Sequence, residues 1–180
     1  MANRTGRLFF ALWPDQDVRG RILTVSEPWR TALRCRWTPP EKLHLTLAFL
    51  GDVAVEQLPV LEAIGQSLRA DAPLVVTFGR LELWPRPQLL CLVGDTPEPL
   101  RGLVKALNRG LAAEGFAIER RPYRPHLTLA RHARRLPEDM TFEPIRWPAS
   151  TVQLVESRPD LPAAPYRCLK AWDLIAAGRR

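Results

Sequence analysis

One five-residue stretch occurs twice in this chain of 180 residues, and this repeat constrains the fold more than any other feature. The two copies are His44-Leu45-Thr46-Leu47-Ala48 and His126-Leu127-Thr128-Leu129-Ala130. They lie 82 residues apart (126 − 44), and at the same offset the apolar run 8–11 matches the apolar run 90–93. A shared offset indicates an internal duplication. We therefore expect two similar lobes related by an approximate two-fold axis.

Polar and apolar residues alternate within each copy, which is typical of a half-buried β-strand. Successive side chains of a strand point to opposite faces, so His44 and Thr46 share one face and the leucines point the other way. The same argument pairs His126 with Thr128. The two-fold axis would then bring one imidazole and one hydroxyl from each lobe together across a central cleft.

The rest of the chain shows helical and strand patterns in mixed order. Apolar residues at helical spacing predict three helices. The first follows Pro14, the second covers residues 58–70, and the third covers residues 100–111. Short apolar runs predict strands over residues 7–13, 43–49, 74–83, 88–93, 116–121, 125–131, 150–156 and 167–174. We expect Gly51-Asp52 to end the first motif strand and the proline-rich residues 132–147 to form a loop.

This order of elements lacks the strict strand–helix alternation of a doubly wound fold. It favours the α+β class, with two pseudo-two-fold-related lobes of mainly antiparallel sheet, outer helices and a central cleft. We interpret residues 1–180 as a single bilobal domain with an internal duplication, whose motif strands lie near residues 43–49 and 125–131.

The charge of the chain points to an anionic partner. The formal net charge is +7, and residues 120–137 contain six arginines and no acid around the second motif. Such a basic segment favours a phosphate or nucleic-acid site. Because 23 of the 26 basic residues are arginine, genome composition is an alternative explanation for the overall charge.

Neither a membrane segment nor a secretion signal is expected. No apolar run approaches the roughly 20 residues that a membrane helix needs. The run 8–13 is too short for the core of a signal peptide and is followed at once by Pro14. We therefore expect a cytoplasmic protein with no membrane partner. A monomer is the simplest state, since the duplication already supplies what a symmetric dimer would.

Two histidines that face one cleft are suited to paired acid–base chemistry. Histidine titrates near neutral pH, so a neutral imidazole can accept a proton while a protonated one donates a proton. Threonine hydroxyls and a nearby arginine can hold the oxygens of a phosphoryl group. This set fits displacement at phosphorus without a metal or cofactor. A single strand histidine is more often structural, and it is the duplication that favours function.

The two motifs resemble the signature motifs of the 2H phosphoesterases. The flanking sequences resemble one branch, the bacterial RNA 2′,3′-cyclic phosphodiesterases, which are also called 2′-5′ RNA ligases. The similar stretches are residues 7–12, 43–51, 124–131 and 154–157. The resemblance implies a bilobal fold that opens the terminal 2′,3′-cyclic phosphate of an RNA, such as a tRNA fragment, to a 2′-phosphate. The reverse reaction would form a 2′-5′ linkage.

The resemblance also implies roles for individual residues. His44 would donate a proton to the leaving 3′ oxygen, and His126 would activate the water. Thr46 and Thr128 would bind the phosphoryl oxygens. The residues alone do not assign the acid and the base, because the two copies are nearly equivalent.

Arg131 and Phe49 occupy equivalent positions in the two copies. Arg131 matches an arginine that contacts phosphate in the family. Strict alternation would place it on the face opposite His126 and Thr128, so a bend or the strand end must turn it into the cleft. Phe49 would pack in the cleft or stack on a base of the RNA.

Two other functions remain open from the sequence. The first is a 2H phosphodiesterase for another small cyclic or 2′-5′ phosphoester. The second is a non-catalytic module that holds RNA ends in the cleft. The intact pair of histidines favours an enzyme.

Overall fold

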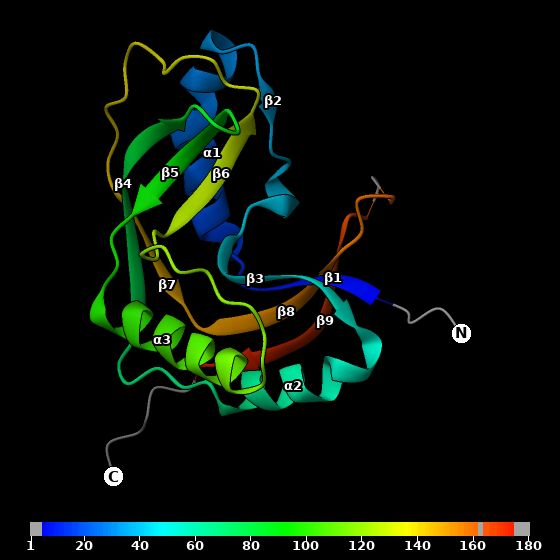
Figure 1. The fold of residues 1–180 in the computed structure, drawn as a ribbon. Coiled ribbons are helices and arrows are strands. Elements are labelled where there is room, and N and C mark those ends of the chain that lie inside the picture. Colours follow the sequence, from blue (N-terminus) through cyan, green and yellow to red (C-terminus); the bar gives the residue numbers. More distant parts are fainter. Residues whose placement is uncertain (1–4, 162–163, 175–180) are drawn as a thin grey trace.

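The computed structural model describes residues 5–161 and 164–174, which form an α+β fold (Figure 1). The helices are α1 (Gln16–Ala32), α2 (Leu58–Ser67) and α3 (Glu98–Ala113), with short 3-10 turns at Pro40–Lys42 and Val55–Gln57. The strands are β1 (Thr5–Leu12), β2 (Arg36–Trp37), β3 (Leu45–Ala54), β4 (Leu74–Trp84), β5 (Leu89–Gly94), β6 (His126–Arg131), β7 (Ile145–Ala149), β8 (Thr151–Ser157) and β9 (Tyr166–Asp173).

The strands form one antiparallel sheet in the order β7-β4-β5-β6-β3-β1-β8-β9, and the short β2 adds to β6. At the centre, β3 and β6 share a single residue pair, Leu45 with Leu127. The sheet therefore divides there into a first lobe (β3, β1, β8, β9) and a second lobe (β6, β5, β4, β7). Each lobe contributes one motif strand to the boundary, as the repeat predicts.

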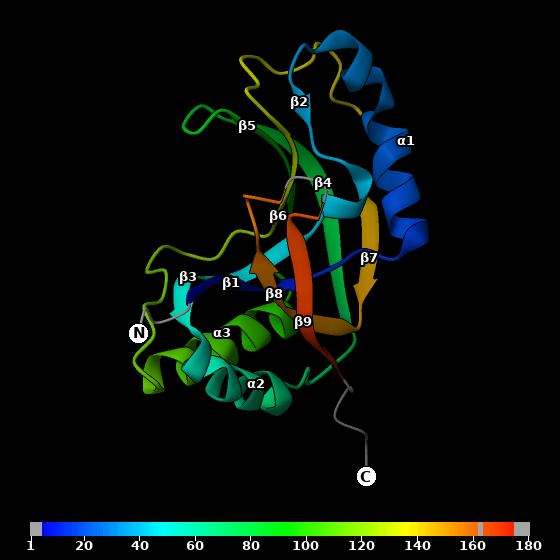
Figure 2. The ribbon, with the colours of Figure 1, turned by 90° about the vertical axis from the view of Figure 1, so that its right-hand side faces the viewer.

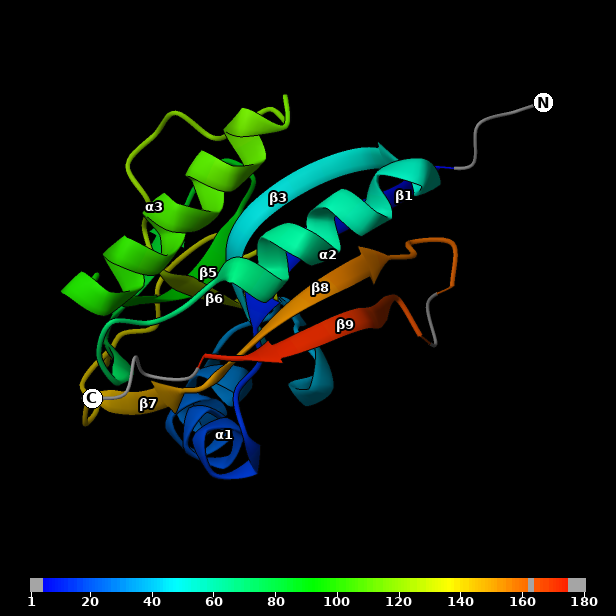
Figure 3. The same cartoon turned by 90° about the horizontal axis from the view of Figure 1, so that it is seen from below.

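The helices cover the outer faces of the two lobes, and two of them cross between lobes. Helix α1 follows β1 of the first lobe but packs on β7 of the second lobe. Helix α3 follows β5 of the second lobe and packs on both β3 and β4, while α2 packs on β8, β9 and α3. Figure 3 shows α2 and α3 side by side, with α2 over the strands of the first lobe. The predicted α+β class with outer helices is confirmed.

Helix boundaries follow from local chemistry. Asp15 caps α1 by accepting a hydrogen bond from the Val18 backbone N–H at 2.8 Å, directly after Pro14. Val18, Ile22 and Trp29 then form the buried stripe of this helix. In α3 the buried residues recur at the same spacing: Leu100, Leu103, Val104, Leu107 and Leu111.

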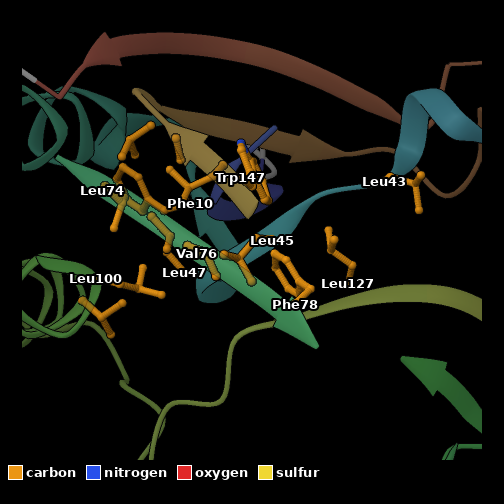
Figure 4. Packing of buried hydrophobic residues seen from close by; sticks show 14 of the residues in the cluster. Phe10, Leu43, Leu45, Leu47, Leu74, Val76, Phe78, Leu100, Leu127 and Trp147 are labelled. Atoms are coloured by element: carbon orange, nitrogen blue, oxygen red, sulfur yellow. The ribbon is translucent and has the colours of Figure 1, made fainter. Parts of the chain in front are cut away.

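One hydrophobic core runs through both lobes. The motif leucines point away from the cleft and belong to this core, and Leu45 and Leu127 are fully buried. Figure 4 shows Leu45 and Leu47 near Phe78 of β4, with Trp147 of β7 also in the cluster. The apolar face of each motif strand therefore anchors the strand, and this leaves the polar face free for the boundary between the lobes.

Both motif strands carry a β-bulge at the same place in the repeat. Along β3, Thr46 pairs with Ala11 and Ala48 pairs with Phe10, so Leu47 has no partner on β1. Along β6, Thr128 pairs with Cys91 and Ala130 pairs with Leu90, so Leu129 has no partner on β5. A bulge inserts one extra residue into a strand. Beyond it, each side chain therefore points to the face opposite to the one that strict alternation predicts.

The strand pairing corrects the alignment of the two halves upstream of the motifs. Ala11 and Cys91 pair with the two motif threonines, so β1 corresponds to β5 with an offset of 80 residues (91 − 11). The match of residues 8–11 with 90–93 at an offset of 82 was therefore two residues out of register. A slip of two residues preserves which face each side chain occupies.

Three predicted elements differ from the structure. Residues 116–121 form no strand, and Ile118 is 40% exposed, because three charged residues follow the short apolar run and no alternating pattern results. Strand β3 continues past Gly51-Asp52 to Ala54, since Gly51 adopts a positive φ of 72° at a register shift instead of ending the strand. The predicted loop 132–147 contains residues 145–147 of β7, which pairs with β4 although it includes Pro148.

Candidate active site

A cavity of about 700 Å³ lies at the boundary between the lobes. The two motif histidines and the two motif threonines all line it, together with Arg131 and Phe49. The structure thus brings all six residues singled out in the sequence to one cavity. Its other lining residues are Arg7, Phe9, Arg36, Trp37, Thr38, Pro39, Lys42, Leu89, Ser157, Pro159, Pro165 and Tyr166.

The same backbone hydrogen bond orients both histidines. The Nδ1 of His44 lies 2.7 Å from the Lys42 carbonyl oxygen, and the Nδ1 of His126 lies 2.9 Å from the Arg124 carbonyl oxygen. A carbonyl oxygen can only accept, so each Nδ1 carries the hydrogen and donates. In the neutral ring, Nε2 then has the free lone pair. The nitrogen available for proton exchange is Nε2 in both residues.

Aromatic rings surround His44. The Trp13 ring stacks on the imidazole at 4.8 Å between centroids, and the rings of Phe9 and Tyr166 each lie at 5.2 Å. Burial is the largest cause that lowers the pKa of His44, and the hydrogen bond to Lys42 opposes it. The positive charges of His126 and Arg131 lower this pKa further.

Glu82, Trp84 and Arg124 form a polar cluster next to His126. The Trp84 ring lies 4.5 Å from the imidazole, and its Nε1 donates to Glu82 at 3.0 Å. Arg124 donates to both carboxylate oxygens of Glu82, at 3.0 and 2.8 Å, with its guanidinium 5.4 Å from the Trp84 ring centroid. The Trp84 hydrogen bond and then Arg124 hold the pKa of Glu82 below its ordinary value. Burial, and to a smaller extent the charge of Arg124, lower the pKa of His126.

The two threonines sit on comparable strands with different neighbours. Thr46 lies opposite Ala11, and its carbonyl oxygen accepts a 2.9 Å hydrogen bond from the Tyr123 hydroxyl. Thr128 lies opposite Cys91, whose thiol pKa is raised to about 12 by burial. Cys91 therefore stays a neutral thiol beneath Thr128 at physiological pH.

The bulge at Leu129 places Arg131 on the same face as His126 and Thr128. This is the bend that the sequence required. Arg131 lies directly opposite Arg36 on β2, and both line the cavity. Like charges in directly opposed positions repel each other, and an anion between them would remove this cost.

The matching bulge at Leu47 brings Phe49 to the cavity in the first lobe. Its ring is 51% exposed, and the Arg7 guanidinium lies 5.0 Å from its centroid. The cavity lining contains four cationic residues, Arg7, Arg36, Lys42 and Arg131, and no aspartate or glutamate. This excess of positive charge suits an anionic ligand.

The six arginines of the basic segment separate in the structure. Arg121 and Arg124 form ion pairs with Glu119 and Glu82, and Arg120 is exposed elsewhere. Of the six, only Arg131 lines the cavity between the lobes. Sequence reasoning missed Arg7, Arg36 and Trp13, because strands distant in sequence bring them to the site.

Within the described residues, no group of three or more His, Cys, Asp or Glu side chains is placed to hold a metal ion. The same part of the chain contains no helix long and apolar enough to cross a membrane.

Two histidines and two threonines on facing strands of a bilobal antiparallel fold define the 2H phosphoesterase class. Within that class, the family model described as the 2′-5′ RNA ligase superfamily matches residues 14–160, and the chain belongs to this superfamily. The predicted family is confirmed.

Relatives and solved structures agree with this assignment. The RNA 2′,3′-cyclic phosphodiesterase of Escherichia coli is 33% identical over 71% of this chain and 72% of its own length. The protein of that name from Thermus thermophilus is 29% identical over 93% of this chain and 90% of its own length. The structure of E. coli LigT complexed with 3′-AMP has a TM-score of 0.78 and 28% identity, and covers 96% of this chain and 99% of that chain.

Proposed function

We propose that the chain is an RNA 2′,3′-cyclic phosphodiesterase that opens a terminal cyclic phosphate to a 2′-phosphate without a metal. The observation that carries this proposal is the duplicated Nδ1 hydrogen bond, which leaves two Nε2 atoms available in one cation-lined cavity. The names of the relatives support the same activity. The reverse reaction, with a 5′-hydroxyl in place of water, would join two RNA ends through a 2′-5′ bond.

The proposed reaction is an in-line displacement at phosphorus. His126 Nε2 takes a proton from water, and the water oxygen forms the new bond to phosphorus. The bond from phosphorus to the 3′ oxygen breaks, and protonated His44 gives its proton to that oxygen. The cycle ends with His126 protonated and His44 neutral, so proton exchange with solvent resets the site. The hydroxyls of Thr46 and Thr128 donate to the non-bridging oxygens, while Arg131 neutralises their charge.

The anionic substrate helps to set these protonation states. Burial and nearby cations lower the pKa of His44 in the free protein. A phosphate bound between the histidines is an opposite charge and would raise this pKa. Substrate binding would therefore favour the protonated acid that the reaction needs.

The RNA itself would bind at the mouth of the cavity. Phe49 presents an exposed ring already contacted by Arg7, and base stacking on such a ring is typical of single-strand binding. RNA with a cyclic end, including tRNA fragments, is the proposed substrate. A cytoplasmic monomer completes this proposal.

The size of the cavity favours a second candidate. A volume of about 700 Å³ is that of a pocket for one small molecule, so the substrate would be a mononucleotide with a cyclic phosphate. Both candidates use the same chemistry. Comparing the two substrates directly distinguishes them.

The test is to incubate chelator-treated protein with an RNA that ends in a 2′,3′-cyclic phosphate and to identify the product. We expect a 2′-phosphate, with the rate lowered roughly 10²- to 10⁴-fold in His44→Ala and in His126→Ala. Thermal unfolding of each variant controls for loss of the fold. A 3′-phosphate product would mean that the 2′ oxygen leaves instead of the 3′ oxygen. Tight RNA binding with no turnover would instead favour the non-catalytic module.

A further inference from the structure

A second cavity of about 580 Å³, which we call the distal pocket, lies next to the active-site cavity. Two chain segments line it, and each continues directly into a wall of the active site. One segment passes from Cys35 to Arg36, and the other from Arg131 to His132. The distal-pocket residues are Ala32, Leu33, Arg34, Cys35, His132, Ala133, Arg134 and Arg135.

The pairing of β2 with β6 fixes this continuity. Arg36 pairs with Arg131, and the chain leaves both residues toward the distal pocket. Figures 1 and 2 show the end of α1, β2 and the segment after β6 gathered at one end of the molecule. A strand of nucleotides that leaves the cyclic end at Arg131 would meet the distal pocket next.

The distal pocket is basic and has an apolar floor. Its lining holds three arginines and no acid, while Leu33 and Ala133 are buried beneath them. Arg135 donates to the Ala32 carbonyl oxygen at 3.2 Å and so offsets the negative end of helix α1. Arg34 and Arg134 are exposed, and no carboxylate within the described residues pairs with them. These two charges remain available for a ligand.

The backbone turns sharply where the two cavities meet. His132 has a φ of 60°, in the left-handed region that residues with a side chain seldom adopt. The turn directs the chain from Arg131 in the active site to Arg134 at the distal pocket. A strained residue at this junction is consistent with a binding surface that extends beyond the catalytic cavity.

We propose that the distal pocket binds the phosphodiester backbone of the nucleotides that precede the cyclic phosphate, through Arg34 and Arg134. Guanidinium groups bind phosphate oxygens strongly, and two adjoining basic pockets match the repeated charge of a single-stranded RNA. The proposal rests on the function proposed above and assigns an oligonucleotide as the preferred substrate.

The test uses the double variant Arg34→Gln/Arg134→Gln with two substrates, adenosine 2′,3′-cyclic phosphate and a short single-stranded RNA with the same cyclic end. We expect kcat/KM to fall roughly tenfold for the RNA, because two phosphate contacts are lost, and to stay unchanged for the mononucleotide. The matched control is Lys105→Gln/Arg109→Gln, which removes two exposed charges from α3 and should affect neither substrate.

A binding measurement separates this proposal from the activity. Fluorescence anisotropy follows a labelled RNA with a 2′-phosphate end as salt is raised. The slope of log affinity against log salt should decrease by about 0.7 for each lost contact in the double variant. Two results would contradict the proposed role of the distal pocket. One is the same RNA affinity and the same salt slope in wild type and double variant. The other is a loss of kcat/KM on the mononucleotide as large as that on the RNA. Absence of turnover in the wild type would overturn the proposed function, while the binding result would still decide the pocket.

Discussion

His44 and His126 share one backbone hydrogen bond but differ in the charges around them. The cationic groups that lower the pKa of His44 are His126 and Arg131, whereas the one acting on His126 is Arg124. Burial is the largest cause for both. Two chemically equal motifs thus become distinguishable through their neighbours, which the sequence repeat alone did not reveal.

This difference predicts separate responses to two arginine substitutions. In the free protein, both motif histidines should titrate below the ordinary value of 6.5. Arg131→Gln removes a positive charge near His44, so the pKa of His44 should rise and that of His126 should not. Arg124→Gln should raise the pKa of His126 and should not raise that of His44. NMR titration can follow this because the chain has only three histidines, and His44→Gln and His126→Gln together assign the signals.

The two substitutions serve as each other's control. Either arginine shifting both histidines equally would contradict the local assignment of charges. The kcat/KM profile should follow the same pattern, since its two limbs report the free enzyme's acid and base.

Arg131 shows the limit of residue-level prediction. The family resemblance predicted that Arg131 contacts phosphate. Strict alternation, however, predicted that its side chain lies on the face opposite His126 and Thr128. The bulge at Leu129 depends on the pairing of β6 with β5, a contact made far along the chain. No local pattern around Leu129 specifies that pairing.

At the scale of elements, the cluster of Glu82, Trp84 and Arg124 connects the end of β4 to the start of β6. Glu82 accepts from both other residues, and the Arg124 carbonyl accepts from His126 Nδ1. Glu82 therefore positions the residues that fix the imidazole without reaching the cavity itself.

Glu82→Gln should lower kcat/KM by roughly three- to tenfold, equivalent to about 1 kcal/mol, because a charged acceptor of two hydrogen bonds is weakened. Intrinsic tryptophan fluorescence should report a changed environment of Trp84. Glu82→Asp keeps the charge and should recover part of the rate. An unchanged rate in Glu82→Gln would show that Trp84 and Arg124 hold His126 without this carboxylate.

The elements that were predicted well carry strong periodic patterns. The stripes of α1 and α3 and the alternation of the motif strands each identify one buried face. Residues 116–121 form no strand, and their three apolar residues followed by three charged ones lack the alternation of the motif strands. Strand β7 was missed because the proline-rich and charged residues 132–147 suggested a loop, while its position at a sheet edge tolerates Pro148.

At the scale of the whole molecule, the matched bulges in the corresponding strand pairs β1–β3 and β5–β6 support the proposal of one bilobal domain formed by duplication. The lobes are joined by little backbone pairing, since only Leu45 and Leu127 bridge β3 and β6. They are joined more strongly by the core, which includes residues of both lobes and of all three helices. We therefore propose that the two lobes fold as one cooperative unit.

Leu127→Ala tests this proposal at the junction. The side chain is fully buried, so its loss should cost about 2–5 kcal/mol of unfolding free energy through lost burial and the remaining cavity. If the lobes are one unit, urea unfolding should keep a single transition with a lower midpoint, and amide exchange should accelerate in β1 and β5 alike. Leu161→Ala, at a side chain 46% exposed, should change stability by less than about 0.5 kcal/mol. Two resolved transitions would mean that the lobes are separate folding units, and that the cleft between them is a domain interface rather than a fixed active site.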